Sequence, residues 1–344
     1  MIVGAFAAKE HDHVARRIDE RQPTAADACA RRAAIAVLSP PVALGITLAV
    51  HWFVPNRQST PSTWFYPTLL ETLLAATCLF LLGQWAWRRL RPAAQHNGPL
   101  LAAAGLLLGL WDLVTLKLDW MPLPYFPGPE MVLAGMLDDR WVLLDSTYHS
   151  LKLLLCGYSI GVTAGLASGI LMGWFRHVRY WGMPILKVLG PIPATAFVPL
   201  AMVLFANAFM SGATLIAMAV WFPVTMLTTS GISNVPVSYF DVARTLGAGR
   251  GFLIFRVAVP ASLPNVFIGL FMGLGSSFLT LIVAETVGVK AGLGWYLKWQ
   301  QGYAEYAKVY AALIIMAVFF SSLMTLLFKI RDWVLVWQKG TIRW

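Results

Sequence analysis

Long apolar runs alternate with short polar segments along the sequence from residue 33 onward. A helix that crosses the hydrocarbon core of a membrane needs about 20 mostly apolar residues. Eight stretches reach this length: 33–53, 68–87, 99–118, 147–174, 184–207, 211–231, 262–285 and 307–328. The chain from Val188 to Phe240 carries no charged side chain and has room for two spans, with a turn at Asn207, Ser211 and Gly212. The pattern predicts an all-α polytopic membrane protein with eight spans.

The composition supports that prediction. Of the 344 residues, 58% are hydrophobic and 12% are charged, whereas a typical soluble domain has about 25% charged residues. So few charges leave too little polar surface for a water-soluble globule, and the 15 Trp residues fit membrane–water interfaces. The three cysteines are far apart, and His11 and His13 stand in a polar tail without further ligands. Neither a disulfide framework nor a metal site is therefore expected.

The distribution of basic residues predicts the topology. The formal net charge is +10, and the Lys and Arg residues flank the apolar runs, which is typical of membrane topology rather than of nucleic-acid binding. When both termini are placed in the cytoplasm, 19 of the 26 Lys and Arg residues fall in cytoplasmic segments. The first 30 residues have no apolar core, so they are expected to be a cytoplasmic tail and not a signal peptide.

A cytoplasmic loop at 236–260 carries the most distinctive pattern. Val237, Phe240, Ala243 and Leu246 recur at every third position, which predicts a short helix with one apolar face. Two interpretations are open at this point. The helix could rest on lipid at the membrane interface, or it could be offered to a groove of a partner protein. The periodicity alone favours neither.

The same loop resembles the EAA motif of ABC importer permeases, which reads E-A-A, three residues, G, nine residues and I-x-L-P. Every gap matches, with Asp for Glu, Val for the first Ala, and Val for both Ile and Leu. The matching positions are Asp241, Val242, Ala243, Gly247, Val257, Val259 and Pro260. In this family the motif forms a coupling helix that docks in a groove of the ATPase subunit, so the resemblance favours docking on a partner. The residues expected to couple the chain to the ATPase are Phe240, Asp241, Val242, Ala243, Arg244, Leu246, Gly247, Arg250, Val257 and Pro260.

The resemblance covers about 98–335 and is greatest to the nitrate/sulfonate/taurine/bicarbonate branch of these permeases. It is carried by GPIPATAFVPL at 190–200, by the segment 243–270, and by LIVAETVGVKAGLGW at 281–295. It implies a six-helix type I ABC importer-like transmembrane core, from which the two additional N-terminal spans depart. The expected divisions are a cytoplasmic tail at 1–32, two extra transmembrane helices at 33–97, the permease core at 98–335 and a cytoplasmic tail at 336–344.

The resemblance also implies partners and a location. The sequence has no G-x-x-x-x-G-K-[ST] phosphate loop. ATP and Mg²⁺ are therefore expected on separate ABC ATPase subunits, and this chain is expected to be no enzyme and to bind no cofactor. The other expected partners are a periplasmic or lipid-anchored solute-binding protein, a second identical permease chain and membrane lipids, with no nucleic acid. The expected location is the bacterial inner membrane, and the expected mechanism is alternating access.

A set of six residues is predicted to line the translocation pathway. Prolines near the start of the fifth span remove backbone donors, and irregular backbone at membrane depth is tolerated only inside protein or beside a water-filled cavity. An acid at the end of the charge-free seventh span is a functional candidate, although it could simply sit hydrated in the interface. Two further residues in the sixth span rest on the resemblance. The six are Pro191, Pro193, Pro199, Trp221, Pro223 and Glu285.

Two alternative functions are an ion-coupled secondary transporter and an integral membrane enzyme. An ion-coupled secondary transporter would need acids or His deep in several spans and an internal repeat, and neither is evident in the sequence. An integral membrane enzyme would need titratable groups converging on one cavity, and the predicted spans carry almost none.

Overall fold

The computed structural model describes residues 25–58, 63–86, 91–287 and 289–337. Within these residues all regular elements are helices and no strand occurs. The chain forms two compact units, the first ending at Ala134 and the second beginning at Gly135, and each is described by itself. The predicted tail at 1–32 lies largely outside the described residues, as do His11 and His13.

The first unit is built from three long helices and the start of a short one. They are α2 (Ala25–Phe53), α3 (Phe65–Ala86), α4 (Arg91–Asp112), which continues as the π-helical η2 (Leu113–Lys117), and α5 (Pro129–Asp138). Glycines let α4 approach α2 closely: a Cβ on Gly98 would lie 1.9 Å from the carbonyl oxygen of Ala36. The helix predicted as the first span of the six-span core, 99–118, therefore packs beside one of the two extra helices.

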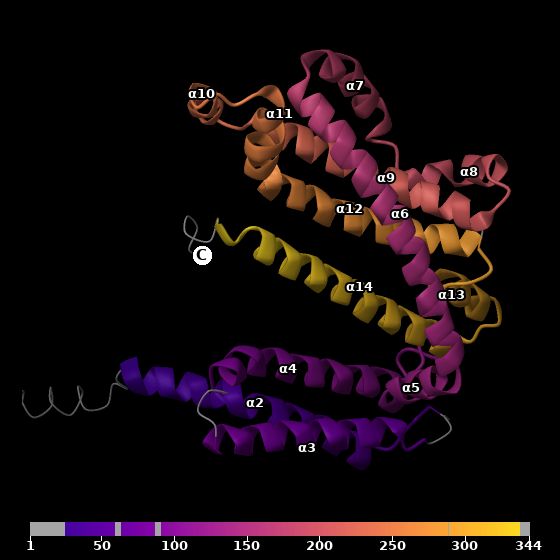
Figure 1. The fold of residues 1–344 in the computed structure, drawn as a ribbon. Helices are drawn as coiled ribbons and strands as arrows, with labels where there is room; N and C mark the ends of the chain where they lie inside the picture. Colours follow the sequence, from indigo (N-terminus) through magenta and orange to yellow (C-terminus); the bar gives the residue numbers. More distant parts are fainter. Residues whose placement is uncertain (1–24, 59–62, 87–90, 288, 338–344) are drawn as a thin grey trace, which may run out of the picture. The chain divides into compact units, whose positions relative to one another are not determined.

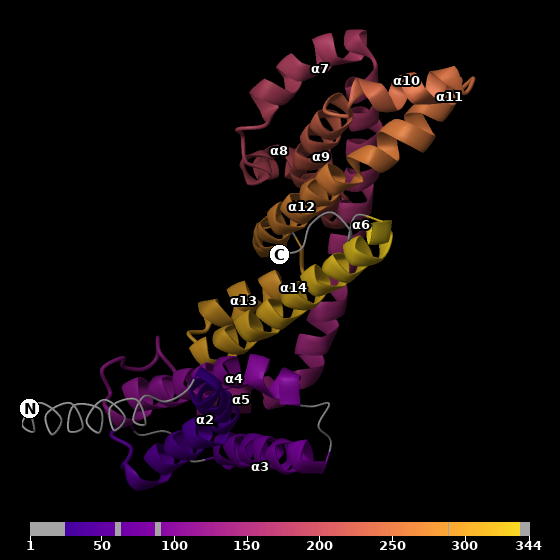
Figure 2. The ribbon, with the colours of Figure 1, turned by 90° about the vertical axis from the view of Figure 1, so that its left-hand side faces the viewer.

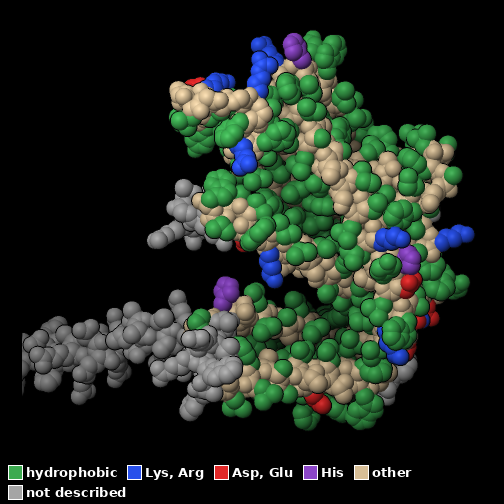
Figure 3. Space-filling view, in the orientation of Figure 1, with side chains coloured by type: hydrophobic (Ala, Val, Ile, Leu, Met, Phe, Trp, Pro, Cys, Tyr) green, Lys and Arg blue, Asp and Glu red, His purple; other side chains and the backbone are tan. Residues whose placement is uncertain are grey.

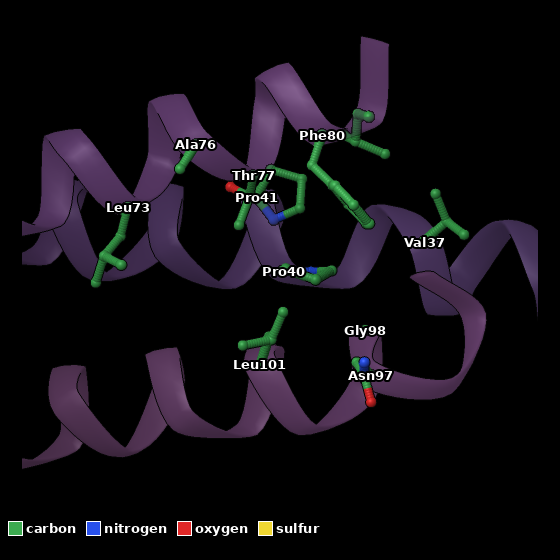
Figure 4. A pocket seen from close by; sticks show the side chains of 11 residues that line it. Val37, Pro40, Pro41, Leu73, Ala76, Thr77, Phe80, Asn97, Gly98 and Leu101 are labelled. Carbon is green, nitrogen blue, oxygen red and sulfur yellow. The ribbon is translucent and has the colours of Figure 1, made fainter. Parts of the chain in front are cut away.

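Polar side chains join the helices of the first unit at one end. The Lys117 ammonium donates hydrogen bonds to the carbonyl oxygens of His51 and Val54, both at 2.6 Å. These are carbonyls at the C-terminal end of α2, where a cation is favourable. The Asp112 carboxylate, fully buried, lies 3.1 Å from the His51 ring. Towards the other end, a cavity of about 350 Å³ opens between the three helices, lined mainly by apolar side chains such as Pro40, Pro41 and Phe80 (Figure 4).

The second unit contains the remaining elements (Figures 1 and 2). They are α6 (Arg140–Trp174), α7 (Arg176–Leu189), η3 (Ala194–Phe197), α8 (Val198–Leu204), α9 (Ala208–Ser233), α10 (Val237–Thr245), α11 (Arg250–Phe252), η4 (Leu253–Ala258), α12 (Val259–Val287), α13 (Leu293–Gly302) and α14 (Tyr306–Val334). Hydrophobic side chains cover most of the visible face of this unit, and charged ones gather near its ends (Figure 3). This is the distribution expected of helices that cross a membrane.

The core of the second unit lies where α9 packs between α6 and α12. A Cβ on Gly161 of α6 would lie 2.6 Å from the carbonyl oxygen of Ala217, and one on Gly165 would lie 2.8 Å from Val224. Gly269 of α12 lies similarly close to the other side of α9. Small residues at four-residue spacing let the backbones of neighbouring helices come together in lipid, and the glycines of α6 and α12 allow this approach to α9.

Seven helices in the described residues are long and apolar enough to cross a membrane. The predicted fifth span, 184–207, is broken close to its prolines, where irregular backbone is predicted. It is a pair of helices, 176–189 and 194–204, bent by 83° at the break, and it supplies an eighth span only if the pair is counted as one. The bend falls at Gly190-Pro191-Ile192-Pro193, where the two prolines lack the N–H donors that would continue the helix.

Three further differences concern where helices begin and which short helices occur. The helix α7 begins at Arg176, eight residues before the predicted fifth span, 184–207. The short helices α5 and α13 were not predicted at all. Because α11 and η4 continue directly into α12, the chain is helical from Arg250 to Val287, longer than the predicted 262–285.

Candidate functional site

The helix α10 projects at one end of the second unit, near α7 and α11 (Figures 1 and 2). All nine of its side chains are described, and none of them is buried. Several of the exposed side chains are apolar: Val237 is 67% exposed and Val242 is 62% exposed, and Leu246, at the helix end, is 83% exposed. A helix that leaves these groups in water within its own chain has a surface suited to a partner.

The predicted apolar face of α10 is only partly correct. Phe240 and Ala243 are half-buried, whereas Val237 and Leu246 are exposed. A strict three-residue spacing drifts by about 60° at each step on a helix of 3.6 residues per turn, so four such positions spread over half the circumference. Phe240 is the inward residue, because its ring meets that of Trp174 edge-on at 5.7 Å between centroids.

The end of α10 is closed by a hydrogen-bonded loop around Gly247. The Ala248 N–H donates to the Ala243 carbonyl at 3.0 Å, and the Gly247 N–H donates to the Arg244 carbonyl at 2.9 Å. This pair is the Schellman arrangement, which needs a left-handed residue after the helix. Gly247 has φ +82°, which costs a residue with a side chain about 1–2 kcal/mol. The geometry therefore makes Gly247 the residue at which the chain leaves α10.

The remaining predicted coupling residues lie around the same helix. Asp241 and Arg244 form an ion pair of 3.1 Å in which both side chains are more than half exposed, so it contributes little to stability. Val242, Val257 and Pro260 help to line a groove of about 780 Å³ beneath α10. The other residues that line it are Gly231, Asn234, Val235, Pro236, Tyr239, Arg256, Ala261, Pro264, Asn265 and Trp337. Arg250 begins α11 and does not line this groove.

A second cavity, of about 360 Å³, lies between the bend after α7 and the helices α9 and α12. Of the predicted pathway residues, Pro193, Trp221 and Pro223 line it, whereas Pro191 and Pro199 do not. Sequence reasoning missed its other lining residues: Leu189, Gly190, Ile192, Ala194, Thr195, Met218, Ala219, Phe222, Met272, Ser276, Leu279 and Thr280. None of these described lining residues is charged, so hydroxyl groups and backbone supply the polarity of the cavity.

Glu285, the sixth predicted pathway residue, is buried away from that cavity. Its carboxylate accepts hydrogen bonds from the Ser150 hydroxyl at 2.6 Å and from the Gly294 N–H at 2.7 Å. The Ser150 oxygen also accepts from the Leu293 N–H at 2.8 Å. A negative charge at the N-terminus of a helix is stabilising, and here it holds α13. Gly292, with φ +111°, lets the chain wrap the carboxylate, because a Cβ there would overlap its oxygen.

A second acid fixes the body of α13. Asp139 accepts a hydrogen bond of 2.7 Å from the Tyr296 hydroxyl and one of 3.1 Å from Gln300. It also pairs with Lys308 at 3.0 Å. Burial and the hydrogen bond to Asp139 raise the pKa of Tyr296. The acids near α13 therefore serve its attachment, and no group of three or more His, Cys, Asp or Glu among the described residues is placed to hold a metal ion.

Comparisons with known proteins agree with the family resemblance seen in the sequence. A family model described as "Binding-protein-dependent transport system inner membrane component" matches residues 161–335. The chain is 35% identical over 189 residues to the putative aliphatic sulfonates transport permease protein SsuC of Bacillus subtilis, covering 55% of this chain and 66% of that protein. It is 31% identical over 222 residues to the taurine transport system permease protein TauC of Escherichia coli, covering 62% and 79%.

One further relative and one solved structure are similar to the chain at lower sequence identity. The chain is 29% identical over 259 residues to the bicarbonate transport system permease protein CmpB of Synechococcus elongatus, covering 70% of this chain and 90% of that protein. Among solved structures, a chain of the inward-facing MetNI methionine ABC transporter aligns with a TM-score of 0.49 at 16% identity, covering 57% of this chain and 98% of that one.

Proposed function

Because this chain belongs to the family of binding-protein-dependent transport system inner membrane components, we propose that α10 is the helix through which a separate ATPase subunit drives it. The observation that carries this proposal is the exposure of α10. Val237, Val242 and Leu246 are largely exposed in the described chain, while the end of the helix is closed by its own backbone. Such a helix keeps its shape without a partner and gains buried area when one binds.

The connection from α10 to the cavity supports a mechanism of alternating access. The helix lies between α9 and α12 in the sequence, and these two helices form the walls of the cavity at Trp221 and Ser276. A displacement of α10 therefore reaches both walls directly. ATP-driven closure of a pair of ATPase subunits would bias the chain between two states, one open to each side of the membrane. ATP and Mg²⁺ belong to the ATPase in this scheme, and this chain contributes no catalytic group.

The proposed solute is a small anion such as nitrate, a sulfonate, taurine or bicarbonate. Support comes from the relatives named for sulfonates, taurine and bicarbonate. It also comes from the cavity, where hydroxyls at Thr195 and Ser276 can donate hydrogen bonds to oxyanions. With no charged residue among the described lining, such a solute would be held weakly enough to leave. A binding protein, rather than the cavity, would then set selectivity.

The assembly and orientation are also proposals. A second identical chain would complete the pathway, and a solute-binding protein would deliver the solute to the face opposite α10. Both termini, and α10 with them, would lie in the cytoplasm, in agreement with the bias of Lys and Arg along the sequence.

A pair of glycine variants tests the coupling assignment. Gly247 and Gly249 lie in the same loop, and a Cβ at either would meet no atom of the described chain within 4 Å. The two glycines differ in backbone conformation: Gly247 has φ +82°, in the left-handed region, whereas Gly249 has φ −73°, which any residue can adopt. We expect Gly247→Val to lose ATPase co-purification and ATP-dependent uptake in proteoliposomes, and Gly249→Val to keep both. If Gly247→Val retains the ATPase and full uptake, the assignment of α10 is wrong.

A further inference from the structure

One side of the cavity between α7, α9 and α12 has no direct chain connection to α10. Residues of α9 and α12 line two of its sides, and these helices flank α10 in the sequence. The third side is formed within the segment 189–195, at the end of α7 and in the bend that follows it. We call this segment the third wall. Because α7 comes before α9 in the sequence, a displacement of α10 reaches the third wall through contacts between helices.

Arg179, in the first turn of α7, makes such a contact with two other helices. Its guanidinium donates to the carbonyl oxygens of Met172 and Gly173 at 2.8 and 2.6 Å. It also donates to the Ser233 hydroxyl at 2.6 Å. The two carbonyls lie in the last turn of α6, where the helix supplies no N–H partner, and Ser233 is the last residue of α9. One planar side chain therefore holds the ends of α6 and α9 to the start of α7.

The helix α10 is attached at the same two places. The ring of Trp174, the residue that follows these carbonyls in the sequence, meets the ring of Phe240 of α10 edge-on at 5.7 Å between centroids. At the other place, α9 ends at Ser233 and α10 begins at Val237. The end of α6 thus contacts both α7 and α10 at one end of the unit (Figures 1 and 2).

The other contacts along α7 are of a different kind. A Cβ on Gly182 would touch the side chain of Met172, Leu186 is 1% exposed, and a Cβ on Gly190 would meet the ring of Phe222. Apolar contacts of this kind have no preferred direction, and packed helices can slide along them. A guanidinium, in contrast, presents its N–H groups in a rigid planar arrangement. Arg179 therefore fixes the position of α7 relative to the ends of α6 and α9.

We propose that Arg179 is the positioning residue that makes α7 move together with α10, so that the third wall responds to the ATPase along with α9 and α12. This inference rests on the proposed coupling role of α10. A displaced α10 moves the end of α6 through Phe240 and Trp174, and Arg179 passes that displacement into α7 and to its bend at Gly190. Without the guanidinium, α9 and α12 still follow α10 through the chain, while α7 is free to slide.

The first experiment uses the full-length permease alone, with native cysteines replaced and the labelled chain diluted in unlabelled chain. Nitroxide labels are placed at the exposed Val242 of α10 and Val188 of α7, and their distance distribution is measured by pulsed electron spin resonance. We expect Arg179→Gln to broaden the distribution. Ser233→Ala, which keeps both carbonyl contacts, should broaden it less, and Arg176→Gln, an exposed basic residue of the same helix, should leave it unchanged. An unchanged distribution in Arg179→Gln would overturn the inference.

The second experiment uses the complex with the ATPase in nanodiscs and follows two walls separately. Thr195→Cys reports on the third wall and Ser276→Cys on α12, since both residues line the cavity. The rate of modification by a small methanethiosulfonate reagent is measured with and without ATP and Mg²⁺. In Arg179→Gln we expect the ATP-induced change in rate to shrink about tenfold at Thr195→Cys and to persist at Ser276→Cys. Arg179→Lys, which keeps the charge and can reach one carbonyl, should restore part of the response.

The outcomes separate this inference from the proposed function. A full response at Thr195→Cys in the Arg179→Gln background would overturn the inference, and so would an equal loss at both positions, which would give Arg179 a general structural role. Equal co-purification of the ATPase with Arg179→Gln and Arg176→Gln shows that assembly is intact. If the parent complex responds to ATP at neither position, the proposed function fails, and the spin-label distances still show whether Arg179 holds α7 to α10.

Discussion

Two short helices of the second unit, α10 and α13, are held in opposite ways. The helix α13 is tied into the chain by Glu285 at its first turn and by Asp139 along its body. The helix α10 has no buried side chain among its nine described residues and is held mainly by Phe240 and by the closure at Gly247. The helix α13 makes its hydrogen bonds with other residues of the chain, whereas α10 has an exposed apolar surface. The contrast indicates which helix serves the fold and which serves assembly.

Loss of the Glu285 carboxylate should give the largest effect on the isolated subunit. Glu285→Ala removes the acceptor of Ser150 and Gly294 in a site where Glu285 is 1% exposed. A buried donor left without an acceptor costs about 1–3 kcal/mol, and two are left here. We expect a markedly lower thermal unfolding midpoint in lipid–detergent micelles. Glu305→Ala, at an exposed carboxylate, should leave the midpoint within about 1 °C. An unaltered midpoint for Glu285→Ala would contradict the attachment of α13.

The second acid should matter less, because it is partly exposed. Asp139→Asn keeps the size and shape of the side chain but removes the negative charge that accepts a hydrogen bond from Tyr296 and pairs with Lys308. Hydrogen bonds to a charged group are worth about 1.5–3 kcal/mol, and a neutral amide retains part of that. We expect a loss of about 1 kcal/mol in the free energy of unfolding, measured by chemical denaturation. The neighbouring Asp138→Asn, at an exposed position, is the matched control. Equal effects of the two variants would contradict a role for Asp139 in holding α13.

Removal of the ring that anchors α10 should have a small effect on stability and a larger one on coupling. Phe240→Ala removes the edge-on contact with Trp174, worth about 0.5–1.5 kcal/mol. The unfolding midpoint should fall slightly, while ATP-dependent uptake should fall several-fold because α10 is no longer held at a fixed angle. Normal uptake by this variant would show that the contact with Trp174 does not orient the helix.

The smallest effect on the subunit is expected from the residue most exposed at the end of α10. Leu246 is 83% exposed, so Leu246→Asp should leave the free energy of unfolding within about 0.5 kcal/mol of the parent. A charge placed in an apolar docking surface should nevertheless prevent co-purification of the ATPase. Leu204→Asp, at another exposed leucine of the unit, serves as the comparison. Retention of the ATPase by Leu246→Asp would place the docking surface elsewhere.

The sequence predicts those helices whose formation depends on residues close together in the sequence. Apolar length located the long helices, and the spacing of apolar residues in the loop 236–260 located α10. The prolines marked the break in the fifth span but not its 83° angle. The helix α13 escaped prediction because its attachment joins residues far apart in the sequence: Glu285 meets Ser150, and Tyr296 meets Asp139. For the same reason, nothing local distinguishes Ser276, which lines the cavity, from other small residues of the long helices.

The most direct test of the central claim is the accessibility of the tip of α10. A cysteine is placed at Leu246 in a chain whose Cys29, Cys78 and Cys156 are replaced by alanine. A membrane-impermeant maleimide is then applied to inside-out and right-side-out vesicles. The account predicts labelling in inside-out vesicles only, and strong protection when the ATPase subunit is bound. Labelling in right-side-out vesicles, or an unchanged rate with the ATPase present, would contradict it.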